Sequence, residues 1–352
     1  MQYPCITADL RKMAENVALV KKKCADSGID IIGVTKGFCA HPEIVEAYLK
    51  GGVSGLGDAR LRNLEKLKSF NVPKYLMRIP MLSEVEDVIR LSNISMNSEL
   101  ETIKALGREA LRQGKVHSII LMVELGDVRE GVLQEEVVDY VREILNINGV
   151  KFLGIGANLS CFGGVIPDEK NMGRLAGLAE QVEQELDINV EIVSGGSTSS
   201  FPLVDKKRMP GKINHLRFGE IFISGTYLDA REGAHYDVFK MEAEVIEIKR
   251  KPSIPTGEIG LDAFFRKPVF EDRGIRKRAL LAIGRQDVDL DQIKPCDKEI
   301  EIIGASSDHL IVDVDSCSRN YRVGDIIEFN LNYVSILRLM TSEYVHKVII
   351  RS

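Results

Sequence analysis

The sequence predicts an α/β fold in which a (β/α)8 TIM barrel is followed by a mainly β domain. Two observations lead to this prediction. Eight short apolar stretches precede residue 228, and helical stretches or loops separate them. Such alternation favours parallel strands joined by right-handed crossovers, and eight units favour closure into a barrel. After about residue 230 the pattern changes, because alternating strand patterns follow one another with few helical patterns between them.

Each expected barrel strand is a short apolar run, and the stretches between the runs carry helical periodicity or turn residues. The strands are expected at residues 31–36, 53–57, 75–79, 94–97, 118–125, 151–159, 190–194 and 215–217. The helices are expected at residues 9–26, 42–51, 61–67, 81–91, 99–113, 134–145 and 168–186. In the first helix, Leu10, Met13, Val17 and Val20 recur at helical spacing.

The change of pattern divides the chain into a barrel domain of residues 1–230 and a β-rich domain of residues 231–352. Within the second domain, strand patterns are found at residues 239–249, 298–303, 310–315, 325–329 and 346–350. Residues 251–277 are rich in proline, glycine and charge and predict a long loop. Loops of this length are usually either functional or disordered.

Composition excludes several classes of partner. The net charge is −5 without a block of basic residues, so neither nucleic acid nor an anionic membrane is an expected partner. No apolar run approaches the roughly 18 to 20 residues that span a bilayer, and Asp9 and Arg11 fall where a signal peptide needs its apolar core. The six cysteines are scattered without CxxC pairs. They predict reduced thiols in a cytoplasmic protein, with neither a disulfide framework nor a metal site.

The first expected barrel strand ends in a lysine, Lys36, which is followed by glycine. Barrels place their chemistry at the carboxyl ends of their strands. A lysine can form an imine with an aldehyde cofactor, provided that its ammonium is deprotonated often enough. The alternative is that Lys36 merely ends a strand in solvent.

Two further segments follow the seventh and eighth strands. The first is rich in glycine and hydroxyl residues, at 194–200, and the second is Arg217-Phe218-Gly219-Glu220. Glycine lets the backbone approach an anion, while N–H groups and hydroxyls bind its oxygens. Barrels frequently bind phosphate with the loops after these two strands. Taken alone, a glycine- and serine-rich segment is more often a flexible connection than an anion site.

These segments resemble those of the pyridoxal-phosphate enzymes of the alanine racemase fold (fold type III), and most closely their ornithine racemase branch. The resemblance extends over essentially the whole chain and is strongest in the barrel. It implies that Lys36 is the residue that bonds pyridoxal 5'-phosphate. Residues 123–131 are similar to the family segment whose arginine lies near the cofactor and the substrate carboxylate, and that arginine is Arg129.

The resemblance also implies a set of residues that bind the cofactor. The phosphate loop corresponds to Ser194, Gly195, Gly196, Ser197 and Thr198. The arginine that meets the pyridine nitrogen corresponds to Arg217, and the amides of the residues after it, Gly219 and Glu220, would hold phosphate. Tyr333 matches a phosphate-binding tyrosine, and Asn158 at the end of the sixth strand could contact the ring.

The chemistry of such enzymes makes these residue types intelligible. The cofactor acidifies the α hydrogen of an amino acid, and Lys36 can take or return that proton on one face. An arginine does not surrender its proton, so Arg217 would keep the pyridine nitrogen unprotonated and the ring a weaker electron sink. This arrangement suits reversible proton transfer. The alternatives are surface ion pairs for Arg217 and Arg129 and core packing for Tyr333.

Racemisation needs a second acid/base on the opposite face. Alanine racemases use a tyrosine of the partner subunit, but this chain has no tyrosine between Tyr236 and Tyr321. Residues 254–257 resemble the lead-in to the family's tyrosine, and the next residue here is Glu258, with Asp262 close behind. A carboxylate can do this work where burial raises its pKa. The weaker candidates are Cys161, Ser307 and His309, and both carboxylates could instead be ordinary loop residues.

The distal amine of a diamino acid would require carboxylates in its pocket. The candidates are Asp287, Asp289 and Asp308, with Ser307 beside the last, although solvated charges would also explain them. The segment 284–289 resembles one that reaches the active site of the partner subunit. The expected protein is therefore a racemase of a small amino-acid substrate, first ornithine, and a head-to-tail homodimer. The alternatives are a cofactor carrier without turnover and a decarboxylase or aldolase of the same fold.

Overall fold

The computed structural model describes residues 2–262, 264–265 and 267–351. The chain divides into two compact units. One comprises Leu10–Tyr236 and the other combines Met1–Asp9 with Asp237–Ser352. The first nine residues, which the sequence pattern assigns to the barrel domain, are therefore grouped with the β-rich unit.

The first unit is a closed barrel of parallel strands, and the predicted (β/α)8 fold is confirmed. The barrel strands, in order, are β2 (Asp30–Val34), β3 (Gly55–Asp58), β4 (Lys74–Leu76), β5 (Ile94–Asn97), β6 (His117–Met122), β7 (Val150–Gly156), β8 (Ile192–Ser194) and β9 (His215–Phe218). Parallel pairing of β2 with β9, with Gly33 opposite Phe218, closes the ring.

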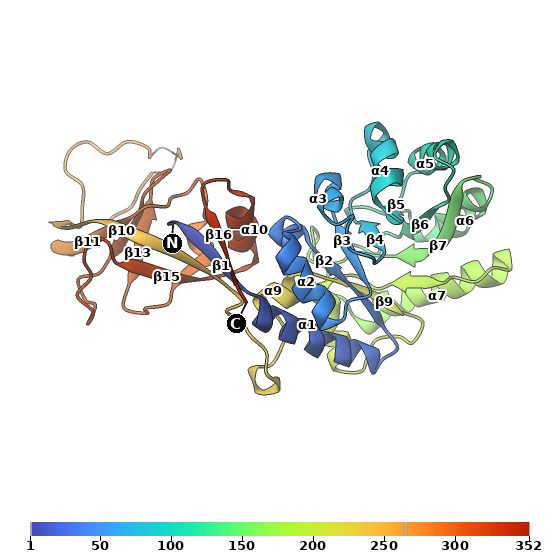
Figure 1. Ribbon diagram of the computed structural model, residues 1–352, viewed down its shortest axis with the longest axis horizontal. Helices are drawn as coiled ribbons and strands as arrows, with labels where there is room; N and C mark the ends of the chain where they lie inside the picture. Colours follow the sequence, from blue (N-terminus) through green and yellow to red (C-terminus); the bar gives the residue numbers. More distant parts are fainter. Residues whose placement is uncertain (1, 263, 266, 352) are drawn as a thin grey trace. The chain divides into compact units, whose positions relative to one another are not determined.

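Helices lie around the outside of these strands in Figure 1. They are α1 (Leu10–Ala25), α2 (Pro42–Gly51), α3 (Leu61–Lys66), α4 (Val85–Leu91), α5 (Leu100–Arg112), α6 (Val137–Leu145), α7 (Glu169–Leu186), α8 (Phe201–Asp205) and α9 (Glu220–Ser224). Their apolar faces pack on the strands, and Leu175 of α7 and Val141 of α6 share one buried cluster with Ile119 and Ile155. Burial of these amphipathic faces is what holds the helices on the barrel.

The interior of the barrel is filled by a second cluster that consists of strand residues, including Ile32, Met96, Ile120 and Met122. Its members alternate along their strands with the residues that face the helices, as the pleat requires. The barrel is therefore a packed core, and its chemistry is confined to the strand ends and the loops that follow them.

Four strands end earlier than the apolar pattern predicts: β2 at Val34, β4 at Leu76, β6 at Met122 and β7 at Gly156. The run expected at residues 118–125 leaves the barrel after Met122, because Val123 forms a bridge with Val132 and the Glu124 N–H donates to the Val132 carbonyl at 2.9 Å. These contacts close a loop of residues 124–131, which carries Arg129. The apolar residues beyond Met122, Val123 and Leu125, are still buried, in the cluster that α6 and α7 share with the strands.

The second unit is built around an antiparallel sheet with the order β12-β15-β10-β11-β14-β13. Its elements are β10 (Phe239–Pro252), β11 (Ile275–Leu281), β12 (Ile293–Pro295), β13 (Glu301–Ala305), β14 (Leu310–Asp313), β15 (Ile326–Leu331), α10 (Tyr333–Thr341) and β16 (His346–Ile350). Strand β1 (Cys5–Asp9) pairs antiparallel with β10 and parallel with β16. These ladders explain why the first residues belong to this unit.

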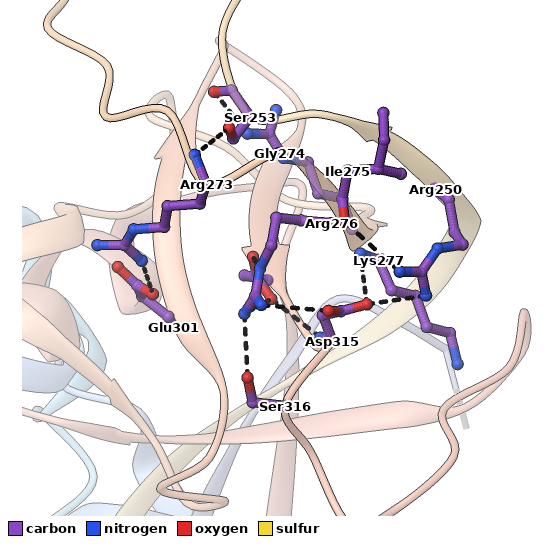
Figure 2. Close-up of polar contacts among 12 residues, drawn as sticks. Arg250, Ser253, Arg273, Gly274, Ile275, Arg276, Lys277, Glu301, Asp315 and Ser316 are labelled. Carbon is purple, nitrogen blue, oxygen red and sulfur yellow. Dashed lines mark hydrogen bonds and ion pairs between the residues drawn. The ribbon is translucent and has the colours of Figure 1, made fainter.

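The predicted long loop joins β10 to β11, and its two ends are pinned together (Figure 2). The Ser253 N–H donates to the Gly274 carbonyl at 2.9 Å, and the Arg273 N–H donates to Ser253 Oγ at 2.6 Å. On the same sheet, Arg276 bonds Asp313 at 2.9 Å and Asp315 at 3.1 Å. The loop is therefore closed at its base by hydrogen bonds and bordered by a network of charged pairs.

Among the helices in the described part of the chain, none is both long enough and apolar enough to cross a membrane.

Candidate active site

Lys36 lies at the carboxyl end of the first barrel strand. It is exposed and begins the 3-10 turn Lys36–Phe38, two residues after β2 ends. The backbone just before it is fixed, because the Thr35 N–H donates to the Gly57 carbonyl at 2.8 Å. The Thr35 hydroxyl donates to Asp58 Oδ2 at 2.6 Å. A hydrogen-bonded backbone thus carries an exposed lysine at the end of the barrel where such folds do chemistry.

Asp58 is a buried carboxyl that supports this strand end. Its Oδ1 accepts from the Arg60 N–H at 2.9 Å and from Asn63 Nδ2 at 3.1 Å. Burial raises the pKa of Asp58, while the bonds from Thr35 and Asn63 oppose that rise. These bonds tie the ends of β2 and β3 to the start of α3.

The glycine-rich segment after β8 and the segment after β9 lie against each other. The Arg217 N–H donates to the Gly196 carbonyl at 3.0 Å, and the Ile221 N–H donates to Thr198 Oγ1 at 3.3 Å. Gly196 has a φ of +107°, and a Cβ there would lie 2.7 Å from Ser200 Oγ. This backbone conformation therefore favours glycine at position 196.

Gly219 and Glu220 continue this surface toward Lys36. A Cβ on Gly219 would lie 3.0 Å from the Val34 carbonyl, so glycine allows the start of α9 to approach β2 closely. Burial raises the pKa of Glu220, whereas a hydrogen bond from Thr226 and the positive charge of Lys36 lower it. The phosphate-loop candidates and Lys36 thus belong to neighbouring strand ends of one barrel.

Arg217 is fully buried, with 1% of its surface exposed. Its Nη1 donates to Ser194 Oγ, and its Nη2 donates to the Ala157 carbonyl at 2.9 Å and to Asn158 Oδ1. Burial lowers the pKa of Arg217 to about 10, opposed chiefly by the charge of Glu130, so the guanidinium is still a cation at neutral pH. A surface ion pair, the alternative for this residue, does not describe it.

The Nε of Arg217 is a buried donor with no hydrogen-bond partner in the described part of the chain. Leaving a buried donor unpaired costs about 1–3 kcal/mol. An acceptor atom of a bound group would remove that penalty. The nitrogen of an unprotonated pyridine ring is such an acceptor, so this arginine fits the cofactor that the sequence predicts.

His215, one turn of the pleat below Arg217, completes a polar group inside the barrel. Its Nδ1 lies 2.8 Å from Ser194 Oγ, and its ring is 5.5 Å from that of Tyr75. His215 was not among the residues predicted for the site. Its signal was the alternation His215-Leu216-Arg217, which directs two polar side chains to the interior face of a strand.

Arg129 and Asn158 are joined by Glu130, which the sequence analysis also missed. Asn158 Nδ2 donates to Glu130 Oε1 at 2.6 Å. Arg129 Nη2 donates to the same oxygen at 2.5 Å, and Arg129 Nε contacts Oε2. A continuous set of polar contacts therefore runs from Ser194 through Arg217, Asn158 and Glu130 to Arg129.

The loop that carries Arg129 is held by two acidic residues. Glu124 Oε2 accepts from the Arg129 N–H at 3.1 Å, and Oε1 accepts from the Val128 N–H at 3.2 Å. Asp127 is buried, and its Oδ2 accepts from the N–H groups of Cys161 and Phe162 at 3.2 and 3.0 Å. Burial disfavours the Asp127 carboxylate, but these backbone bonds outweigh it and lower the pKa. The loops after β6 and β7 are thereby fixed to each other.

The remaining predicted residues belong to the β-rich unit. Glu258 and Asp262 are exposed on the loop between β10 and β11, and Asp262 Oδ1 accepts from the Phe264 N–H at 2.8 Å. Ser307 is exposed and donates to Asp308 Oδ2 at 2.6 Å, and His309 lies in the same turn. Tyr333 is the first residue of α10.

Two of the aspartates proposed for the substrate amine have contacts of a structural kind. Asp287 is buried and accepts from Ser342 Oγ at 2.6 Å. Asp289 caps a 3-10 turn and lies 3.6 Å from an Arg338 nitrogen. Asp308 is exposed, so of the three it is the aspartate best suited to meet an external ligand.

The barrel, its strand-end lysine and its buried arginine together define a class of protein, which comparison with known proteins then identifies. The chain belongs to the alanine racemase family: the family described as "Alanine racemase, N-terminal domain" matches residues 8–226. The fold and family expected from the sequence are confirmed.

Individual relatives agree with this assignment. The chain is 46% identical to the ornithine racemase of Acetoanaerobium sticklandii over 349 residues, which covers 98% of this chain and 99% of the relative. It is 39% identical to the lysine racemase of Thermotoga maritima, with 99% of both chains covered. The solved structure of alanine racemase from Clostridium difficile 630 shares the fold, with a TM-score of 0.79, 16% identity, and coverage of 100% of this chain and 97% of that chain.

Proposed function

We propose that this protein is a pyridoxal-phosphate-dependent amino-acid racemase whose substrate is ornithine. The observation that carries the proposal is the unpaired, buried Nε of Arg217 on the same barrel as the exposed amine of Lys36. The ornithine racemase relative at 46% identity supports the choice of substrate, and the lysine racemase relative makes lysine the nearest competitor.

The residues that would hold the cofactor lie at the ends of β2, β7, β8 and β9. Lys36 would bond it, Arg217 and Asn158 would meet the ring, and the phosphate would lie on the segment Ser194–Thr198 and on Gly219 and Glu220, with Tyr333 as a further ligand. When bound, pyridoxal phosphate supplies an electron-withdrawing ring that acidifies the α hydrogen of an amino acid. The Arg217 guanidinium offers donors only, so it leaves a ring nitrogen without a proton and moderates that withdrawal.

The proton would be moved by Lys36, whose Nζ is exposed at the strand end. Its backbone is held by Thr35 and Asp58, so motion is confined to the side chain. Arg129 would bind the substrate carboxylate through its Nη1 amine, because Nε and Nη2 already donate to Glu130. This division of donors orients the α carbon with respect to Lys36.

The second acid/base is proposed to come from the loop of a second copy of the chain, as Glu258 or Asp262, in a head-to-tail homodimer. The loop supports this proposal because it exposes large apolar side chains, with Phe265 86% exposed and Val269 94% exposed. Exposed apolar groups of this size are typical of surfaces that another protein covers. Asp308 with Ser307 is proposed to meet the distal amine of ornithine.

The activity is tested by reconstituting the chain with pyridoxal phosphate and assaying L-ornithine, L-lysine and L-alanine for loss of optical rotation and for solvent deuterium at the α carbon. We expect ornithine to react fastest, and Lys36→Ala to lose both the visible absorbance of the bound cofactor and at least ~10²–10⁴-fold in rate. Lys50→Ala, an exposed lysine on α2, is the control and should keep both.

Other results would redirect the proposal. Bound cofactor whose spectrum no amino acid changes would indicate a carrier without turnover, and release of carbon dioxide or an aldehyde would indicate a decarboxylase or aldolase. For the dimer, Lys36→Ala mixed with a Glu258→Gln/Asp262→Asn variant should restore about a quarter of the activity, since half of the random dimers carry one intact site. No recovery on mixing would reject a shared site.

A further inference from the structure

We propose that Glu130 is a positioning residue for both active-site arginines: it holds the Arg129 guanidinium directly and the Arg217 guanidinium through the Asn158 amide. The inference rests on the proposed function, because it assigns Arg129 to the substrate carboxylate and Arg217 to the cofactor ring. It adds a carboxylate that the sequence analysis did not assign to the site.

The hydrogen bonds that join Arg217, Asn158 and Glu130 run in one direction. Arginine can only donate and a carboxylate can only accept. The Asn158 side chain, which lies between them, accepts from Arg217 with Oδ1 and donates to Glu130 with Nδ2 at 2.6 Å. Both partners therefore require the same orientation of the Asn158 amide, with its oxygen toward Arg217 and its nitrogen toward Glu130.

Glu130 also supplies a negative charge close to both guanidinium groups. Arg217 is fully buried, and the nearby Arg129 guanidinium disfavours its positive charge. Glu130, with 18% of its side chain exposed, is the carboxylate that favours that charge and also contacts Arg129. Removing the negative charge would leave two guanidinium groups at one site without this counterion, which is costly when one of them is buried.

Glu130 contacts one edge of the Arg129 guanidinium. Glu130 takes the Nε and one Nη2 donor, a two-point contact that fixes the plane of the guanidinium. The main chain of Arg129 is fixed separately by Glu124. Glu130 therefore determines the direction of Arg129 Nη1, whereas Glu124 holds the main chain of Arg129.

The test compares Glu130→Gln and Asn158→Leu, with Glu135→Gln as the control because Glu135 is an exposed carboxylate five residues along the chain. KM for ornithine reports on Arg129, and the dissociation constant of pyridoxal phosphate by equilibrium dialysis reports on Arg217. Glu130→Gln should weaken both by about 10- to 100-fold, the range for losing a hydrogen bond to a charged group. Asn158→Leu should weaken cofactor binding, whereas Glu135→Gln should leave both quantities within about twofold of the wild type.

Three results would overturn the proposal. In the first, Glu130→Gln matches Glu135→Gln in both quantities. In the second, it changes cofactor binding alone, which removes its role at Arg129. The third needs no cofactor: the fall in the thermal unfolding midpoint of Glu130→Gln/Asn158→Leu equals the sum of the two single falls, which means that the residues are not coupled. This last measurement separates failure of the inference from failure of the proposed function, because it is made on the cofactor-free chain.

Discussion

Two buried histidines should make the folded barrel sensitive to mild acid. Burial, together with the charge of Arg217, lowers the pKa of His215 to about 3. Burial, together with the charge of Lys115, lowers the pKa of His117 to about 4. An unfolded histidine has a pKa of about 6.5, so at pH 5 both side chains are neutral in the folded chain and protonated in the unfolded chain.

The sign of the effect follows from proton binding. Between about pH 6.5 and pH 4 the unfolded state binds more protons, so the free energy of unfolding falls as the pH falls. Each histidine contributes about 1.4 kcal/mol per pH unit well below 6.5, or about 2 kcal/mol at pH 5. The two together should lower the free energy of unfolding by about 4 kcal/mol between pH 8 and pH 5.

The assay is urea unfolding followed by circular dichroism at several pH values from 5 to 8. In His117→Gln, an amide can still bond Ser95 Oγ, which lies 2.8 Å from His117 Nε2. This variant should lose about 2 kcal/mol less than the wild type on going to pH 5. His346→Gln, at an exposed position, is the control and should follow the wild type. An identical pH dependence for His117→Gln and the wild type would refute the reasoning.

Two further predictions concern the packing and the loops of the barrel. Gly154→Ala should prevent normal folding, because its Cβ would lie 1.8 Å from the Ile192 carbonyl across the β7–β8 ladder. Gly173→Ala, at a position on α7 where a Cβ meets no atom within 4 Å, should raise the free energy of unfolding by up to ~1 kcal/mol. Soluble yield and the thermal unfolding midpoint test both variants, and a wild-type midpoint for Gly154→Ala would contradict the packing argument. Asp127→Ala should lower the free energy of unfolding by about 1–3 kcal/mol, because it leaves the N–H groups of Cys161 and Phe162 unpaired, and it should raise KM. Asp139→Ala, at an exposed position, is the control and should change neither quantity. Unaltered kinetics in Asp127→Ala would mean that the loops after β6 and β7 hold their positions without this carboxylate.

The barrel could be predicted from the sequence because its signals are local. Each strand is a short apolar run and each helix has its own periodicity, so the order of elements follows from neighbouring residues. Lys36 and Gly196 lie just beyond the ends of β2 and β8, where the local pattern also placed strand ends. Strand lengths were less predictable, since Val123 and Leu125 continue the buried apolar pattern although β6 ends at Met122.

The support of the site could not be predicted because its contacts join residues distant in sequence. Asp127 and Glu130 stand in a charged, glycine-containing stretch that is typical of a solvated loop. What distinguishes them is that Asp127 accepts a hydrogen bond from the Phe162 N–H and Glu130 accepts one from Asn158 Nδ2. The pairing of β1 with β10, in which Cys5 lies opposite Glu242, likewise cannot be predicted from the pattern of neighbouring residues.

Strand β1 has a consequence for how the chain can be divided. The polypeptide leaves the β-rich unit after Asp9, builds the whole barrel, and returns at Asp237. During synthesis, more than two hundred residues are therefore added after β1 before β10 is made and can pair with it. A fragment that starts at residue 237 would lack the strand that covers β10 on one side and β16 on the other, and would present two bare edges to its neighbours. The barrel is, in this sense, an insertion within the smaller unit.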